Sequence, residues 1–359
     1  MRPTSTQPPR HVGILTGGGD CPGLNAVIRA VTQSLILQAG VRVTGIEQGF
    51  LGLIEGRFRP LELADVTHIL GDGGTVLGAH NAANPFDWHG EDVSAQALAN
   101  ARALGLDALV VVGGDGTMRI AHRFDQLGLP VVGVPKTIDN DLLHTDRTFG
   151  FDSAVAVVSE ALQRLQTTAR SHQRVMILET MGRYAGWIAL HGGLAAGADI
   201  LLIPEVPFSP HIVAEACTHC VARQGYALIC IAEGAHAATG KQIVRAHLPH
   251  SPDPLRLGGV GEWLCQQLEG TLTSEVRSTQ LGHIQRGGPP TPFDAVLATL
   301  FGWHAAQLVL QGQFGRMVVL RGQACASVPL VDVAQGIRTV GLNDPALLAA
   351  RDLGICLGN

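Results

Sequence analysis

Runs of consecutive apolar residues alternate along this chain with longer helical patterns, and this alternation restricts the possible folds more than any other feature. A strand that is apolar throughout, instead of alternating with polar residues, is buried on both faces, as in parallel sheets. Repeated strand–helix units indicate parallel sheets with right-handed crossovers. The predicted strands lie in HVGILTGGG (11–19), DALVVVGGDG (107–116), PVVGVPK (130–136), RVMILE (174–179), ADILLIP (198–204), YALICIAEG (226–234) and EVRSTQLGHIQ (275–285). We therefore predict the α/β class.

The bulk properties narrow the class of protein further. A chain of 359 residues, 46% of them hydrophobic, can form two domains or one large α/β domain. Its net charge of −5 comes from mixed signs, which argues against nucleic acid or an anionic membrane as the main partner. We expect a loose tail over residues 1–10 and no apolar run long enough to cross a bilayer. Seven scattered cysteines suit a reducing, cytoplasmic compartment.

A dense polar cluster follows one predicted strand, in GVPKTIDNDL (133–142). It comprises Lys136, Thr137, Asp139, Asn140 and Asp141. Asp, Asn and Thr are favoured helix caps, so a helix start is one interpretation. Ligands of open parallel sheets, however, bind beyond the carboxyl ends of the strands, where this cluster falls. The cluster is therefore also a candidate binding site.

Two glycine-rich turns follow other predicted strands. TGGGDCPG (16–23), with Gly18 and Gly19, matches neither GxGxxG nor GxxxxGK[ST], so a plain strand-to-helix turn is as good an interpretation as a phosphate site. VVVGGDGT (110–117) is more specific. Its residues Gly114, Gly116 and Thr117 would admit a phosphate closely, and Asp115 could hold Mg²⁺ directly or through water. A simple Gly-Asp-Gly turn remains the alternative.

The turn GGDGT resembles the motif of the phosphofructokinase superfamily, which also includes NAD kinases and diacylglycerol kinases. TGGGDCPGLNAVIR, PKTIDND, SHQRVMILETMGR and LGHIQRGG, in this order, resemble the 6-phosphofructokinase family from about His11 to Leu320. The resemblance implies two Rossmann-like three-layer α/β/α domains with mostly parallel sheets. It implies a nucleotide-binding domain over 11–149 and about 287–335, and a sugar-phosphate-binding domain over 150–286 and about 336–359.

The resemblance also implies an activity and its residues. The expected reaction is ATP-dependent phosphorylation of fructose 6-phosphate to fructose 1,6-bisphosphate, with Asp139 as general base and Lys136 beside the transferred phosphoryl group. The positions matching sugar contacts are Thr137, Asp139, Asp141, Arg174, Met181, Gly182, Arg183, Glu233, Arg277, His283 and Arg286. Those matching the nucleotide site are Gly18, Gly19, Gly114, Asp115, Gly116 and Thr117, with Mg²⁺ at Asp115.

The resemblance further implies a homo-oligomer, a dimer or tetramer, that shares its active sites. Arg174 and Arg277 would reach the sugar phosphate of a neighbouring subunit, while His283 and Arg286 would bind the sugar phosphate of their own. Arginine suits this role because its planar group donates two parallel hydrogen bonds to phosphate oxygens.

Two positions in the sequence point to different phosphoryl donors. Pyrophosphate-dependent members usually carry a second Asp where this chain has Gly116, which leaves space for a nucleotide α-phosphate. ATP-dependent members usually carry Gly where this chain has Lys136. We expect ATP, because a lysine near the transferred phosphate is useful with either donor.

One family residue is missing from the sequence. Members usually carry an arginine shortly after the GGT.LG turn, where this chain has His80 and Asn81 in GGTVLGAHNAANP. Our hypothesis is that Lys136 or His80 replaces it. The alternatives are a pyrophosphate-dependent phosphotransferase, a catalytically weakened regulatory or binding subunit, and, more remotely, another kinase of the superfamily.

Overall fold

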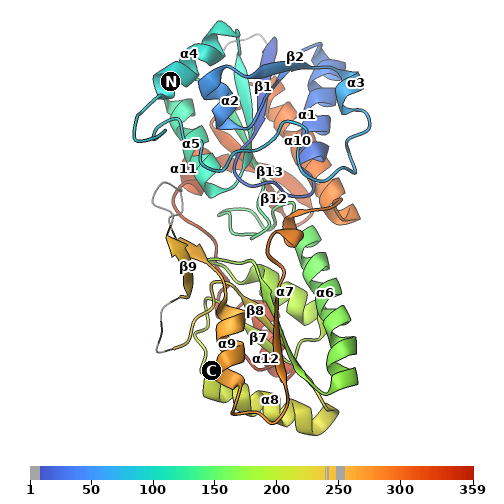
Figure 1. Cartoon of the computed structure of the whole chain (residues 1–359). Helices are drawn as coiled ribbons and strands as arrows, with labels where there is room; N and C mark the ends of the chain where they lie inside the picture. The colour runs from blue at the N-terminus through green and yellow to red at the C-terminus, as the bar shows by residue number, and fades with distance from the viewer. Residues whose placement is uncertain (1–8, 239, 241, 248–254) are drawn as a thin grey trace. The chain divides into compact units, whose positions relative to one another are not determined.

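The computed structural model describes residues 9–238, 240, 242–247 and 255–359 (Figure 1). The expected tail over residues 1–10 therefore lies almost entirely outside the described residues. The chain forms two compact units. Unit 1 comprises Met1–Ile138, Leu142–Asp152 and Arg286–Ile337; unit 2 comprises Asp139–Asp141, Ser153–Gln285 and Arg338–Asn359. The sequence placed the first boundary at 149/150, which would put residues 139–141 in the first domain, whereas they belong to unit 2.

Unit 1 is built on one mixed sheet, which has seven strands within the described residues. The strands are β1 (His11–Thr16), β2 (Arg42–Ile46), β3 (Phe58–Leu61), β4 (Ala108–Gly113), β5 (Val131–Pro135), β12 (Arg316–Arg321) and β13 (Ala324–Pro329). Their order is β13-β12-β5-β4-β1-β2-β3, with parallel neighbours except for the antiparallel edge strands β13 and β3. The predicted strands β1, β4 and β5 lie side by side at the centre, where every residue is buried.

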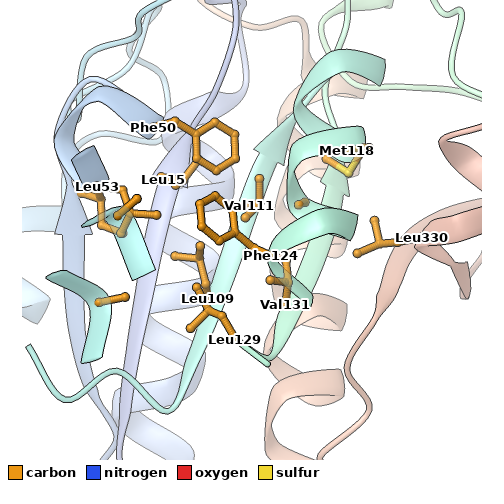
Figure 2. Packing of buried hydrophobic residues seen from close by; sticks show 14 of the residues in the cluster. Leu15, Phe50, Leu53, Leu109, Val111, Met118, Phe124, Leu129, Val131 and Leu330 are labelled. Atoms are coloured by element: carbon orange, nitrogen blue, oxygen red, sulfur yellow. The ribbon is translucent and has the colours of Figure 1, made fainter. Parts of the chain in front are cut away.

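Helices cover both faces of this sheet. The helices of unit 1 are α1 (Leu24–Ala39), α2 (Phe50–Glu55), α3 (Leu63–Val66), α4 (Ser94–Ala103), α5 (Asp115–Gln126), α10 (Pro292–Leu310) and α11 (Leu330–Val333). Figure 2 shows the core beneath α2, α5 and α11. Leu109 and Val111, two positions apart on β4, point to the same face, where the rings of Phe50 and Phe124 stack with centroids 5.9 Å apart.

Unit 2 has a smaller sheet, which is parallel throughout. Its strands β6 (Val175–Thr180), β7 (Ile200–Leu202), β8 (Ala227–Ala232) and β11 (Val276–Gln280) run in the order β11-β6-β8-β7. A separate antiparallel pair joins β9 (Val244–His247) to β10 (Leu255–Leu257). The helices are α6 (Phe151–His172), which begins in unit 1, α7 (Trp187–Ala196), α8 (Pro210–Gln224), α9 (Val260–Leu268), the 3₁₀ helix η1 (Gly282–Arg286) and α12 (Pro345–Asp352).

All seven predicted strands are present, and the predicted α/β class with mostly parallel sheets is confirmed. Helix α10 is long and apolar enough to cross a membrane by length and composition alone. Half of its apolar window is nevertheless buried, and it packs along α1, where Gly302 lies against Ala30 and the backbone of Val27. We therefore assign α10 to the core of unit 1.

Candidate active site

The glycine-rich turns of unit 1 meet at one edge of its sheet. Strands β1, β4 and β5 are parallel neighbours, so their carboxyl ends share that edge, and there β1 is followed by TGGG and β4 by GGDG. The backbone N–H of Gly17 donates to the carbonyl of Val112 (2.8 Å), which ties the first turn to β4. A Cβ on Gly17 would lie only 2.8 Å from the methyl of Thr117. Glycine is needed there because the two turns touch.

Lys136 extends from the end of β5 into the same region. Its side chain is 5% exposed, and its Nζ donates to the carbonyl of Gly19. A Cβ on Gly18 would lie 3.5 Å from this Nζ and 3.6 Å from the hydroxyl of Thr117. Gly18 has a φ of 73°, a left-handed conformation that favours glycine. Gly18 and Gly19, two of the residues predicted for the nucleotide site, therefore lie beside a buried ammonium group.

Asp115 occupies the first position of α5, at the positive end of the helix dipole. Its Oδ2 lies 3.0 Å from the guanidinium of Arg119 one turn later, and its Oδ1 accepts from the N–H of Gly116 (2.6 Å). No group of three or more metal-ligating side chains occurs among the described residues. One accessible carboxylate fits Mg²⁺ nonetheless, because Mg²⁺ is usually held by one or two carboxylates together with substrate phosphates.

Gly116 faces open space. Among the described residues, the only atom within 4 Å of a Cβ added there is Nη2 of Arg119, at 3.8 Å. Its φ also lies outside the left-handed region, so other residues could adopt this backbone. Glycine is therefore not required at this position by the packing of unit 1, unlike Gly17.

His80 and Asn81 stand where family members usually carry the missing arginine, and their surroundings differ from those of Lys136. The carbonyl of Gly78 accepts from the hydroxyl of Thr16 at the end of β1 (2.9 Å), which joins this segment to the strand edge. The His80 ring packs edge-on against Trp88, with centroids 5.7 Å apart, and its Nδ1 is buried with no hydrogen-bond partner among the described residues. Of the residues named in the hypothesis, Lys136 has its ammonium group beside the first glycine-rich turn.

A thiol also borders the first turn. Burial raises the pKa of Cys21 to about 12, even though the charge of Lys136 acts in the opposite direction. The thiol is therefore neutral at physiological pH and donates toward the carbonyl of Phe149 (3.9 Å). Cys21 adds no negative charge to a region suited to anions.

The segment 139–141, which holds the predicted base Asp139, belongs to unit 2 and is held by Arg338. The guanidinium of Arg338 donates through Nε (3.2 Å) and Nη2 (3.0 Å) to the carbonyl of Asn140, and its backbone N–H donates to the carbonyl of Asp141 (2.7 Å). Asn140 has a left-handed φ of 52°, which is uncommon for a residue other than glycine. The Arg338 guanidinium in turn lies 4.6 Å over the Trp187 ring.

Several predicted sugar-binding residues meet at the carboxyl ends of β6 and β8. The backbone N–H of Glu233 donates to the carbonyl of Thr180 (2.9 Å), and that of Gly234 donates to Gly182 (3.1 Å). The backbone N–H of Met181 donates to Oε1 of the buried Gln285 in η1 (3.2 Å). The structure thus brings Met181, Gly182, Arg183 and Glu233 together, with η1, which carries the exposed His283, joined to the same edge.

Two carboxylates outside the predicted site residues, the buried Glu179 and the partly buried Glu205, support this edge. Glu179 accepts from the backbone N–H groups of Gly259 (2.9 Å) and Gly261 (2.8 Å) at the start of α9. Glu205 accepts from Gly186 (3.0 Å) and Val340 (2.8 Å), and burial raises its pKa although these bonds act in the opposite direction. Glu179 lies inside the SHQRVMILETMGR stretch and Glu205 lies outside the quoted motifs, and the structure shows what each carboxylate holds.

Arg174 and Arg277 do not join the other sugar-binding candidates. They lie at the amino ends of β6 and β11, and both form ion pairs with Glu275. A strand of six residues spans roughly 20 Å at about 3.3 Å per residue. The backbones of Arg174 and Arg277 therefore lie at the opposite ends of the strands from Met181. Arg286, at the end of η1, belongs to unit 1, where its guanidinium lies against Gly19 so closely that a Cβ there would overlap it.

The chain is similar to known proteins in both sequence and fold. Residues 11–309 match the family model described as "Phosphofructokinase". A pyrophosphate–fructose 6-phosphate 1-phosphotransferase of Streptomyces coelicolor is 47% identical over 97% of this chain and 99% of its own. An ATP-dependent 6-phosphofructokinase 2 of Clostridium perfringens is 46% identical over 97% and 98%.

A solved structure of phosphofructokinase from Saccharomyces cerevisiae superimposes on this chain with a TM-score of 0.79. It is 31% identical and covers 91% of this chain and 45% of the yeast chain. The fold therefore matches that of a solved family member, and the family model spans more than half of the sequence. The chain belongs to the phosphofructokinase family.

Proposed function

We propose that this chain transfers the γ-phosphoryl group of ATP to the 1-hydroxyl of fructose 6-phosphate, giving fructose 1,6-bisphosphate. Phosphoryl transfer needs little covalent help from a protein, so positioning and charge stabilisation carry most of the rate. The support is the family membership, together with two residue sets suited to those tasks: an anion-binding edge in unit 1 and a polar strand edge in unit 2.

The roles follow from the chemistry of each set. The glycine turns and the amino end of α5 would bind the polyphosphate, and Asp115 would hold Mg²⁺, which supplies charge neutralisation. Asp139 would accept the proton of the sugar hydroxyl. Lys136 and Asp139 are three residues apart, so their Cα atoms are within about 11 Å of each other whatever the chain conformation. A cation and a base can therefore serve one reaction.

The observation that carries the choice of ATP is the open space at Gly116, because the relatives are named for both donors. A nucleotide α-phosphate needs room and no negative charge beside the turn, and glycine meets both conditions. The test is to measure fructose 1,6-bisphosphate formation by the purified chain with Mg²⁺ and either ATP or pyrophosphate. Product with pyrophosphate alone would overturn the choice of donor, and product with neither would favour a regulatory subunit.

Two further parts of the proposal concern assembly and compartment. Arg174 and Arg277 lie at the amino ends of their strands, away from the other predicted sugar-binding residues, which supports the idea that they serve the sugar site of a neighbouring subunit in a dimer or tetramer.

A cytoplasmic location is supported by the cysteines, because all seven fall within the described residues and each is a free thiol.

Lys136→Met should lower kcat by about 10²–10³-fold, because a preorganised cation at the transferred phosphate typically contributes several kcal/mol to transition-state stabilisation. Methionine keeps the apolar stem but removes the charge near Gly18 and Gly19. Steady-state kinetics with both donors would measure the effect, and Lys136→Arg should restore part of it. An unchanged kcat for Lys136→Met would show that the lysine does not replace the missing arginine.

Arg338→Met should lower kcat by about 10- to 100-fold while the KM for ATP changes little. The change removes two charged hydrogen bonds to the Asn140 carbonyl, each worth roughly 1.5–3 kcal/mol, so segment 139–141 would leave its present conformation part of the time. The matched control is Arg351→Met on the exposed side of α12. Equal effects of the two substitutions would contradict a positioning role for Arg338.

A further inference from the structure

The carboxylate of Glu205 joins two segments of unit 2. Its Oε1 accepts from the backbone N–H groups of Gly186 (3.0 Å) and Val340 (2.8 Å), and its Oε2 accepts from Gly186 as well (3.1 Å). Gly186 ends the turn MGRYAG (181–186), which carries predicted sugar contacts and which we call the sugar turn. Val340 lies two residues after Arg338, the residue that holds segment 139–141.

The approach of Glu205 to the sugar turn is close. A Cβ on Gly186 would lie 2.4 Å from the Cβ of Ile203 and 2.9 Å from Oε2 of Glu205, so a larger residue would push the carboxylate away. Gly186 stands directly before α7, where backbone N–H groups lack helical partners and negative charge is favoured. Capping α7 is therefore one role of Glu205, but that role would involve Gly186 alone.

The contacts of residues 338–340 go beyond a helix cap. Val340 shares the Oε1 atom that holds Gly186, although it is 135 positions from Glu205 in sequence. Trp187, the first residue of α7, makes a parallel connection, because its indole Nε1 donates to the carbonyl of Arg338 (3.1 Å) and its ring lies under the Arg338 guanidinium. The start of α7 and Glu205 together thus support the residues that hold segment 139–141.

The other residues of the sugar turn are held from a different side. The carbonyl of Gly182 accepts from the N–H of Gly234 (3.1 Å), and that of Arg183 accepts from the side-chain amide of Gln242 (3.2 Å). Glu205 holds the end of the turn and links it to residue 340. The spacing matters for catalysis, because a misplacement of about 1 Å can cost about 100-fold in rate.

We propose that Glu205 is a positioning residue for phosphoryl transfer, which keeps the sugar turn and segment 139–141 at one spacing. It acts through Gly186 and Val340 and not on the substrates. The catalytic consequence rests on the proposed function, in which Asp139 is the base and the sugar turn contacts fructose 6-phosphate. The linkage itself does not, so the two can be tested separately.

The first test is steady-state kinetics of Glu205→Ala, which should lower kcat by about 10- to 100-fold and raise the KM for fructose 6-phosphate. The KM for ATP should change little, because the predicted nucleotide site lies in unit 1. Glu205→Gln should recover most of the loss, since an amide oxygen can accept both of the bonds that Oε1 makes.

The matched control is Asp199→Ala, at the other end of β7. The Asp199 carboxylate also accepts from a backbone N–H, that of Leu228 (2.9 Å), and from the side-chain amide of Gln224 (2.9 Å). Its loss should lower the melting temperature, as the loss of Glu205 should, but should leave kcat within about twofold of wild type. A purely stabilising role for Glu205 would make the two alanine variants alike.

The second test does not depend on activity. Hydrogen–deuterium exchange of the peptide 136–143, which holds segment 139–141, should become at least about tenfold faster in Glu205→Ala and not in Asp199→Ala. This peptide reports on the linkage because Arg338 stands between it and Glu205. If the wild-type chain made no fructose 1,6-bisphosphate, the proposed function would fail and exchange alone would decide the linkage. Kinetics like those of Asp199→Ala, or unchanged exchange over 136–143, would overturn the inference.

Discussion

Asp139→Asn should lower kcat for fructose 6-phosphate phosphorylation by about 10²–10⁴-fold, the usual contribution of a general base. The amide cannot accept the sugar proton at neutral pH, but it has the same shape as the carboxyl group. Arg338 holds the neighbouring carbonyls of Asn140 and Asp141, which the substitution leaves in place, so the segment should keep its conformation. The KM for each substrate should therefore change much less than kcat.

Steady-state kinetics across pH would separate the loss of a base from a loss of structure. The wild-type kcat should decline on the acidic side as Asp139 becomes protonated, and this decline should disappear in the variant. Asp352→Asn, the same chemical change at an exposed position at the end of α12, is the control. A kcat within tenfold of wild type for Asp139→Asn would exclude Asp139 as the base.

Gly116→Asp should lower kcat/KM for ATP by about 100-fold and leave activity with pyrophosphate, if any, much less affected. Two like charges about 4 Å apart repel by roughly 4 kcal/mol at an effective dielectric constant of about 20, and Arg119 would offset part of this. The chain itself tolerates the side chain, because a Cβ meets only Arg119 at 3.8 Å. An acid in the first turn of α5 also favours the helix.

A graded series would show which property of Gly116 matters. Gly116→Ala adds only a methyl group, Gly116→Asn adds the volume of aspartate without its charge, and Gly116→Asp adds both. We expect a small loss, an intermediate loss and the full loss of ATP turnover in that order, with similar melting temperatures. If the alanine and aspartate variants lost the same activity, space and not charge would exclude the nucleotide. If none lost activity, Gly116 would not select the donor.

Much of the fold could be predicted because burial leaves a direct trace in the sequence. Strands β1, β4 and β5 are apolar throughout since both of their faces are covered, and that pattern is visible without a structure. The glycines of the two turns are equally visible, since close backbone approach, as between Gly17 and Thr117, excludes other residues. The edge strands β3 and β13, and β12 beside β13, have partly exposed residues and were not predicted.

Part of the candidate site depends on contacts between residues far apart in the chain. Arg338 holds the carbonyl of Asn140 across 198 positions, and Glu179 holds the N–H of Gly261 across 82, and neither pair shares a motif. Glu275 draws Arg174 and Arg277 together only because β6 and β11 are neighbours in the sheet. Strand order, which local patterns do not encode, decides the last of these contacts.

The sequence by itself thus determined the parallel α/β class, the residues at the carboxyl ends of the central strands, and the glycines that an anion would require. Each of these follows from burial or from backbone sterics within a few residues. Only the tertiary structure decided which carbonyls Arg338 holds, at which edge of the sheet each arginine starts, and which side of α10 remains exposed. The last point shows the reason clearly. Helix α10 is apolar nearly all round, so its buried side is chosen by the packing of Gly302 against α1 and not by its own pattern.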